Sequence, residues 1–565
     1  MYSREYMGNF TRVLRDVKLA AGLLALAAGA LPGCQPRREA VDLLVTNATV
    51  YTVDSAFNKA EAFAVRDGKF VAVGTSTDLL RRYQATQTVD AHGQFVYPGF
   101  YDAHCHFYRY ALGLRSADLV GASSWAETVG RLTRHRQQQP DAVWLTGRGW
   151  DQNDWPGQRF PTKDTLDRLF PNVPVLIARI DGHAALANQK ALDLAGVTAA
   201  TPISGGVIKH DAQGRLTGLL VDNAVQLVAA KIPEPGPVEA DAALLQGQQN
   251  CLAVGLTSLA DAGLDKANID RMTALQQAGK LHLRLYVMLN PTPENKAYYL
   301  PRGPYFSDNL TISAFKVYAD GALGSRGAAL LAPYTDQPSE TGFLLQHPEY
   351  YRALAKELAA TKFQMNTHAI GDSSNRLLLD IYGAALMGQK DRRWRIEHAQ
   401  VVSQADVPKF GQYQIVPSVQ PTHATSDMYW AGQRLGPPRL KTAYAYQDLL
   451  KQYGQVALGS DFPIEDINPL YGFHAAVARQ DAKNFPAGGF QMENALSRPE
   501  ALRGMTTWAA HAAFEEKRKG QIRPGMLADF VVLKTDLLTV PKEQLRNAKV
   551  QQTWIGGKQV FSIKN

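Results

Sequence analysis

Six side chains that could bind metal ions and activate water stand at the ends of short, mostly apolar runs. They are His104, His106, Lys316, His368, His398 and Asp461. Successive side chains of a β-strand point to opposite faces, so His104 and His106 share one face and could share a metal, while Cys105 faces away. The later members follow at separations of 30 to 210 residues, which favours successive strand ends of a parallel barrel over a local zinc finger. The pattern predicts a metal-dependent hydrolase.

The elements that must hold these side chains form a repeating series of strands and helices. Short apolar runs that end in polar residues predict strands at 96–104, 256–261, 283–289, 312–319, 363–368, 394–398, 415–420 and 456–461. Helical stretches, such as 349–361 and 373–387, lie between several of these runs. Alternating strands and helices predict an α/β protein with a parallel sheet, here closed into a (β/α)8 barrel.

Three other parts of the chain do not belong to the barrel repeat. The connection after the first predicted strand, about 107–255, is too long for one strand–helix unit. It predicts an inserted subdomain, which should cover the active site because such connections lie at the catalytic face. Near the chain ends, residues 43–54, 62–74, 526–534 and 549–562 alternate and are rich in strand-forming residues, and neither end can bury a core alone.

Four longer segments extend the pattern. They are VYPGFYDAHCH (96–106), GRGWDQNDW (147–155), DGHAALANQKAL (181–192) and KVYADGALGSRGA (316–328). With the later histidines and the final aspartate, they resemble the amidohydrolase superfamily, and within it the branch that includes N-substituted formamide deformylases, amidohydrolase family 3. The resemblance runs from about Asp42 to the C-terminus. It implies a TIM barrel from 96 to 519 and one small flanking β-sandwich built from 41–95 and 520–565.

The resemblance also implies an activity. Its members hydrolyse carbon–nitrogen bonds other than peptide bonds, here in an N-substituted amide or formamide, by attack of a metal-bound hydroxide. One or two divalent ions, most simply Zn²⁺, are implied: His104, His106 and Asp461 would hold the first, and His368 and His398 the second. Asp461 would also take the proton of the attacking water and pass it to the leaving nitrogen.

Lys316 needs a separate explanation within such a site. An ammonium group beside two divalent cations would be repelled and has no lone pair to donate. In enzymes of the family that the chain resembles, a lysine at this strand end is carboxylated by CO₂ on its terminal nitrogen and bridges two metals. The alternative is a lysine whose stem covers apolar surface while its head reaches water.

Five further residues have predicted roles outside the set of metal ligands. Trp150 and His183 in the insert, and Asp320 and Arg326 in the glycine-rich loop after the strand-end lysine, are predicted substrate contacts. A packed aromatic, a surface histidine and an ion pair within the loop are the alternatives. Glu397 precedes a ligand histidine on the same strand, so strand alternation turns it away from the metal and predicts a supporting role.

The composition of the chain limits which other classes of function are possible. The chain of 565 residues is 45% hydrophobic and 20% charged, and its net charge of +8 is scattered, so an ordinary globular protein with no nucleic-acid partner is expected. A small-molecule substrate is expected, and a homodimer is left open. Two other functions remain: hydrolysis of an ester, lactone or cyclic amide on the same fold, and ligand binding without turnover by an envelope lipoprotein.

The N-terminal segment predicts export. Basic residues at 12, 15 and 18 precede an apolar run at 19–30, and LPGC follows, ending at Cys34. We expect residues 1–33 to be a cleaved bacterial signal peptide and Cys34 to carry a lipid, which would hold the protein on a membrane of the cell envelope, in the outer membrane or periplasm. The other cysteines, Cys105 and Cys251, indicate no disulfide framework.

Overall fold

A parallel β-barrel forms the centre of the computed structural model, which describes residues 38–233 and 235–563. Its eight strands, each parallel to the next, are β8 (Phe100–Cys105), β15 (Leu256–Leu264), β16 (Arg284–Leu289), β18 (Leu310–Tyr318), β19 (Gln364–Ala369), β20 (Arg395–His398), β21 (Val416–Val419) and β22 (Ala457–Leu458). A short strand, β17 (Tyr305–Phe306), adds to β18 in the antiparallel sense. The barrel predicted from the sequence is therefore confirmed.

Backbone hydrogen bonds just beyond β22 bring the last strand back to the first. Asp461 N donates to His104 O at 2.7 Å, and His106 N donates to Phe462 O at 2.7 Å. Side chains of the barrel strands are buried on both faces, as in the run RLYVML of β16, which is the pattern that a parallel sheet covered by helices requires.

Helices pack around the outside of the barrel, and α10 (Pro348–Ala359) illustrates why they form. Proline stands in its first turn, where no N–H is needed, and Tyr351, Leu354, Ala355 and Leu358 place one buried face against the strands. The remaining helices around the barrel are α2 (Phe107–Gly113), α7 (Pro237–Ala253), α8 (Lys266–Gln277), α9 (Pro293–Tyr299), α11 (Asp372–Leu386), α12 (Pro408–Tyr413), α13 (Pro421–Asp427), α14 (Ala431–Leu440), α15 (Tyr446–Tyr453), α16 (Pro469–Ala478), α17 (Arg498–Gly504) and α18 (Thr507–Ala512).

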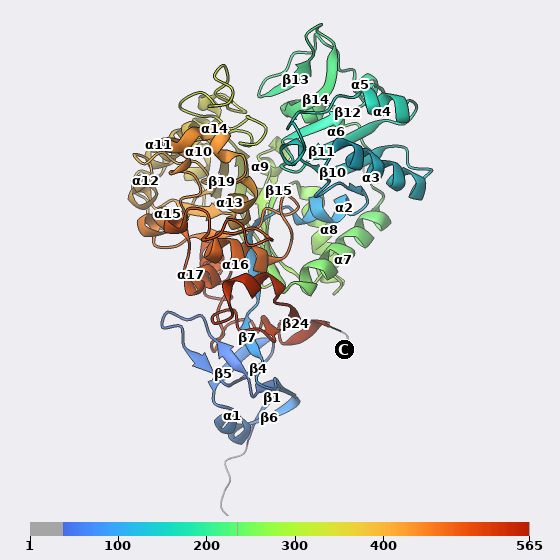
Figure 1. Cartoon of the computed structure of the whole chain (residues 1–565). Helices are drawn as coiled ribbons and strands as arrows, with labels where there is room; N and C mark the ends of the chain where they lie inside the picture. The colour runs from blue at the N-terminus through green and yellow to red at the C-terminus, as the bar shows by residue number, and fades with distance from the viewer. Residues whose placement is uncertain (1–37, 234, 564–565) are drawn as a thin grey trace, which may run out of the picture.

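Two sheets made from both chain ends lie at one side of the barrel, at the bottom of Figure 1. One contains β5 (Lys69–Gly74), β4 (Ala62–Arg66), β1 (Glu39–Thr46) and β6 (Tyr83–Asp90); the other contains β25 (Lys558–Ser562), β24 (Val550–Ile555), β23 (Phe530–Leu533), β7 (Phe95–Pro98), β2 (Thr49–Tyr51) and β3 (Lys59–Ala60). Phe63 and Phe70 from the first sheet share a core with Phe530 and Trp554 from the second. The terminal β-sandwich is thus confirmed.

The first predicted strand, 96–104, is in fact two strands with Gly99 between them. β7 belongs to the terminal sandwich, and β8 belongs to the barrel. A Cβ atom at Gly99 would lie 2.3 Å from Thr257 Oγ1, so only glycine lets the chain pass so close to β15. The Pro98-Gly99 pair is the signal in the sequence that could have revealed this break.

A fourth sheet occupies the long connection after β8. Its strands follow the order β13 (Gly206–His210), β14 (Leu216–Asp222), β12 (Ala184–Ala187), β11 (Val175–Arg179), β10 (Leu145–Trp150) and β9 (Ala117–Asp118). The helices α3 (Trp125–Gln138), α4 (Asp164–Leu169), α5 (Gln189–Ala195) and α6 (Asn223–Ala229) accompany it, at the upper right of Figure 1. We call this unit the inserted sheet; its exact boundaries stay a prediction.

The predicted signal segment and Cys34 lie outside the described residues. In the described part of the chain, Cys105 and Cys251 are buried free thiols. Among the same residues, no helix combines the length and the apolar character needed to cross a membrane.

Candidate metal centre

The predicted ligands converge at the carboxyl ends of the barrel strands. His104 lies near the end of β8, Lys316 near the end of β18, His368 in β19 and His398 at the end of β20. The ring centroids of His368 and His398 are 4.5 Å apart, and those of His104 and His398 are 5.1 Å apart. Side chains from strands far apart in sequence therefore surround one point.

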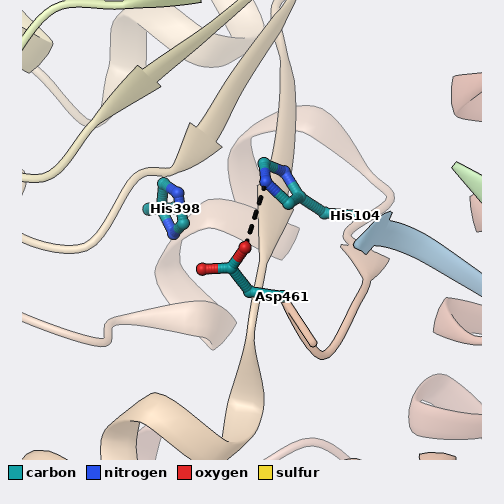
Figure 2. Close-up of side chains that lie close together, drawn as sticks. All are labelled: His104, His398 and Asp461. Carbon is teal, nitrogen blue, oxygen red and sulfur yellow. Dashed lines mark ion pairs between the residues drawn. The ribbon is translucent and has the colours of Figure 1, made fainter. Parts of the chain in front are cut away.

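His104, His398 and Asp461 form the tightest group, with one ligand atom of each within 4.8 Å of the others. Figure 2 shows the Asp461 carboxylate between the two rings, with one oxygen directed at His104. That oxygen, Oδ1, lies 3.4 Å from His104 Nε2 and 3.2 Å from His106 Nε2. All of these side chains are buried or nearly so.

Three buried side-chain atoms of the predicted ligands at this site lack a hydrogen-bond partner. They are His368 Nε2, His398 Nδ1 and Asp461 Oδ1. Buried polar atoms are normally satisfied, and imidazole nitrogens with a carboxylate oxygen are the donors that zinc and similar ions take. The residues present therefore fit a divalent metal.

Hydrogen bonds behind His104, in β8, and His106, just after it, direct the Nε2 atoms of both rings toward the centre. His104 Nδ1 lies 2.6 Å from Glu397 Oε2, and His106 Nδ1 lies 2.9 Å from the carbonyl oxygen of Ala262. Each Nδ1 is therefore the protonated nitrogen, which leaves Nε2 with its lone pair facing the site. Burial lowers the pKa of His106 to about 4, which keeps that ring neutral.

Glu397 supports His104 in this way, but strand alternation misjudged its direction. The side chain enters the barrel interior, as the 2.6 Å contact with His104 Nδ1 shows. His398, the next residue, has a φ of 75°, which ends the strand and turns this histidine to the same side. The alternation rule holds only while the backbone stays extended.

Lys316 is enclosed beneath the histidines. It is 1% exposed, and its Nζ lies 2.9 Å from His104 Nε2. Burial lowers the pKa of this amine to about 8, because water cannot solvate the ammonium form. The alternative of a lysine whose head reaches solvent is therefore wrong.

Asp461 is held by a tight loop after β22. Its own φ is 61°, and the preceding Ser460 donates its backbone N–H and its hydroxyl to the buried Asp102 carboxylate. A Cβ atom at Gly459 would lie 2.5 Å from His104 N, so the GSD sequence is what lets the loop press against β8. Burial opposes the charge of Asp461, yet the histidines around its carboxylate, His423 among them, keep its pKa well below the usual range.

A cavity of about 900 Å³ opens above the cluster. Its wall contains His183, His368, His398, His423 and Asp461. A volume of this size suits a small organic molecule.

Of the four predicted substrate contacts, His183 is the one that reaches this cavity. Its ring centroid is 5.1 Å from that of His368, and Asp222 Oδ1 holds its Nδ1 at 2.6 Å. Arg148 of the inserted sheet donates hydrogen bonds to the carbonyl oxygens of Ile180 and Pro463. The loops that carry His183 and Asp461 are thereby joined.

The other three predicted substrate contacts interact with other parts of the protein and do not line the cavity. Trp150 is fully buried in the core of the inserted sheet and donates its indole N–H to Ile177 O at 3.0 Å, so it offers no surface to a substrate. Asp320 is buried, and its carboxylate accepts the backbone N–H groups of 329, 370 and 371 and the Ser374 hydroxyl. Arg326 pairs with Asp336 at 2.9 Å and is absent from the cavity wall. Trp150 therefore supports the core of the inserted sheet, and Asp320 and Arg326 fix loops.

His423 is a cavity residue that the sequence reasoning missed. It lies in α13, directly after β21, and its Nδ1 is 3.1 Å from Glu465 Oε1 while its Nε2 is 3.5 Å from Asp461 Oδ2. Burial opposes protonation of His423, but the two carboxylates outweigh it and raise its pKa to about 10. The signal was present in the sequence, because QPTHAT follows the seventh predicted strand just as other polar patterns follow their strands.

A parallel eight-stranded barrel that gathers histidines and a carboxylate at the carboxyl ends of its strands is the architecture of a metal-dependent hydrolase. Known proteins agree with this class. The model of the amidohydrolase family matches residues 87–561, and the chain belongs to this family, as its sequence predicted.

Individual relatives cover almost the whole chain. Protein LONG AFTER FAR-RED 3 of Arabidopsis thaliana is 34% identical over 92% of this chain and 91% of its own length. N-substituted formamide deformylase of Arthrobacter pascens is 27% identical over 91% of this chain and 97% of its own length. The crystal structure of an uncharacterized metal-dependent hydrolase from Pyrococcus horikoshii OT3 matches with a TM-score of 0.73 at 27% identity, over 88% of this chain and 99% of that one.

Proposed function

We propose that this protein is a zinc-dependent amidohydrolase that cleaves the carbon–nitrogen bond of an N-substituted amide or formamide. The observation that carries the proposal is the group of His104, His398 and Asp461, whose ligand atoms lie within 4.8 Å of one another beneath a cavity of about 900 Å³. Similarity to an N-substituted formamide deformylase supports this substrate class.

The donor set suggests which residues hold metal. His104, His106 and Asp461 would bind one ion, and His368 and His398 would bind a second. The unpartnered Nε2 of His368 and Nδ1 of His398 support this assignment. A divalent ion in such a site polarises a carbonyl group and acidifies water.

Lys316 would complete the pair of sites as a carbamate. The neutral amine is the form that attacks CO₂, and the lowered pKa of Lys316, about 8, makes that form accessible near neutrality. The nitrogen then carries an anion in place of a cation. Support comes from the close approach of Nζ to His104 Nε2, at 2.9 Å, a distance at which a positive charge beside a metal would be repelled.

The remaining chemistry belongs to side chains of the cavity wall. Asp461 would accept the proton of the attacking water and return it on the path to the leaving nitrogen. His183, oriented by Asp222, would bind the substrate. The wall would exclude bulk water, which strengthens these interactions.

A metal analysis combined with a substrate panel tests the proposal. Purified protein should contain one to two divalent ions per chain, and it should hydrolyse members of a panel of N-formyl and N-acyl amines. Chelation should abolish this activity, and Zn²⁺ should restore it. Full activity in metal-free protein would contradict the mechanism, while turnover of matched esters or lactones but of no amide would move the protein to the esterase function. A wild-type protein that binds metal and turns over neither class would support a ligand-binding role.

A further inference from the structure

The site contains a histidine beyond the predicted ligands, and its two ring nitrogens face two different carboxylates. His423 Nδ1 is 3.1 Å from Glu465 Oε1, and its Nε2 is 3.5 Å from Asp461 Oδ2. Glu465 Oε1 also accepts the Ser426 hydroxyl at 2.7 Å. The carboxylate that orients the ring is therefore itself fixed.

Asp461 stands between His423 and the metal centre. Its Oδ1 faces His104 and His106, whereas its Oδ2 faces His423. Oδ1 of Asp461 therefore faces the predicted metal ligands, and Oδ2 faces the histidine on the cavity wall. A proton that reaches Asp461 has a direct way to His423 Nε2.

The position of the ring also suits contact with a substrate. His423 lines the cavity, and its ring is stacked with that of His398 at 15° and 5.8 Å between centroids. The residue is 9% exposed, so it is held firmly and yet reaches the cavity. A proton donor needs this combination, because it must lie within hydrogen-bond reach of the atom that it protonates.

We infer that His423, oriented by Glu465, is the group that donates the proton to the leaving nitrogen. This inference rests on the proposed amide hydrolysis. The oxygen of water bonds to the carbonyl carbon, and its proton goes to Asp461. The carbon–nitrogen bond breaks with its electron pair on nitrogen, which takes the proton from His423 Nε2. Asp461 then returns the proton of the water to Nε2, so an acid and an amine leave and the side chains regain their starting state.

Leaving groups of different basicity provide the test. The formamides of cyclohexylamine, aniline and 4-nitroaniline differ in how much they need a proton on nitrogen as the bond breaks. His423→Gln should lower kcat/KM for the cyclohexylamide by about a hundredfold or more, in the range of one lost proton-transfer group. The loss for the 4-nitroanilide should stay below about tenfold, because its nitrogen needs less help. The bound metal should stay at the wild-type level.

Two further variants make the result unambiguous. Glu465→Gln leaves the imidazole in place, so it should show the same dependence on the leaving group with a smaller loss, and it answers the question should His423→Gln fail to fold. His347→Gln changes an exposed histidine at the start of α10 and should match the wild type with each substrate. Equal losses for all three formamides, or no loss, would overturn the inference alone. A wild-type protein that cleaves none of the N-formyl and N-acyl amines of the panel would overturn the proposed function as well.

Discussion

The barrel side of the cavity and the inserted sheet above it hold their polar side chains in opposite ways. On the barrel side, buried histidine nitrogens are left without a hydrogen-bond partner, as His368 Nε2 and His398 Nδ1 are. In the inserted sheet, one buried arginine is fully paired with the side chains around it. Arg179 is 1% exposed and binds Asp151, Asp181 and Gln152 at once.

This difference indicates how work is divided between the two regions. Unpaired nitrogens on rigid strand ends can bind an external ligand such as a metal ion. A closed ion-pair network has no unpaired group to offer, and it fixes the conformation of the loops around it. Changes on the barrel side should therefore alter the chemistry. Changes in the inserted sheet should alter stability or the choice of substrate.

The largest effect is expected for Asp461→Asn. The amide keeps the volume but cannot accept and return a proton, so kcat should fall by about 10²- to 10⁴-fold. Steady-state kinetics on a substrate found in the panel would measure this loss, and thermal unfolding should stay near that of the wild type. Asp448→Asn, at an exposed position of α15, is the matched control. Normal turnover by the Asp461→Asn variant would place proton transfer on another residue.

The next largest effect is expected for Lys316→Ala. It should lower turnover by about a hundredfold or more and reduce the metal bound per chain, since the bridging group is gone. Short carboxylic acids such as acetate should partly restore activity by standing in for the carbamate. Lys316→Arg should show no such rescue, because a guanidinium stays protonated and fills the space. Wild-type activity in Lys316→Ala would remove the carbamate from the mechanism.

A smaller and different effect is expected for His183→Ala in the wall formed by the inserted sheet. Loss of one hydrogen bond to the substrate should raise KM by about tenfold, with less change in kcat. Trp150→Phe is the informative comparison, since this indole is buried and bonded to Ile177 O. It should lower the melting temperature and leave KM unchanged. A shift of KM in Trp150→Phe would show that this core does reach the substrate.

The smallest effect on chemistry is expected for Arg179→Met. Removing the guanidinium leaves Asp151 and Asp181 without their shared partner, which should reduce the free energy of unfolding by about 3–5 kcal/mol. Denaturant unfolding would measure this change. Metal content per chain should equal that of the wild type, and a loss of metal would mean that the two regions do not act separately.

Sequence reasoning succeeded where topology alone sets the position of a residue. The residues His104, His106, Lys316, His368, His398 and Asp461 come together because the carboxyl ends of parallel strands meet at one face of a barrel. β18, β19 and β20 begin and end within two residues of their predicted bounds. The roles of these residues as ligands remain predictions.

Prediction from the sequence was wrong where a backbone turn or a loop sets the position of a side chain. The φ of 75° at His398 brought Glu397 inside the barrel, and no periodicity reports such an angle in advance. Trp150 and Asp320 lie in glycine-containing motifs that could equally hold a substrate or a structural contact. The structure shows that Trp150 packs in the core of the inserted sheet and that Asp320 fixes a loop. His423 was missed because a lone histidine after a strand is a weak signal.

The shared core of the terminal sandwich governs when this protein can finish folding. Phe63 and Phe70 are made early in synthesis, but their partners Phe530 and Trp554 emerge last, so the early strands must wait for nearly the whole chain. Until then they expose apolar surface and unpaired strand edges, which invite aggregation and proteolysis. Because β7 continues through Gly99 into β8, the strand that carries His104 gains its final support only at this last step. A ribosome that stops some 40 residues short would release a chain whose barrel is complete but whose first strand has lost its anchor.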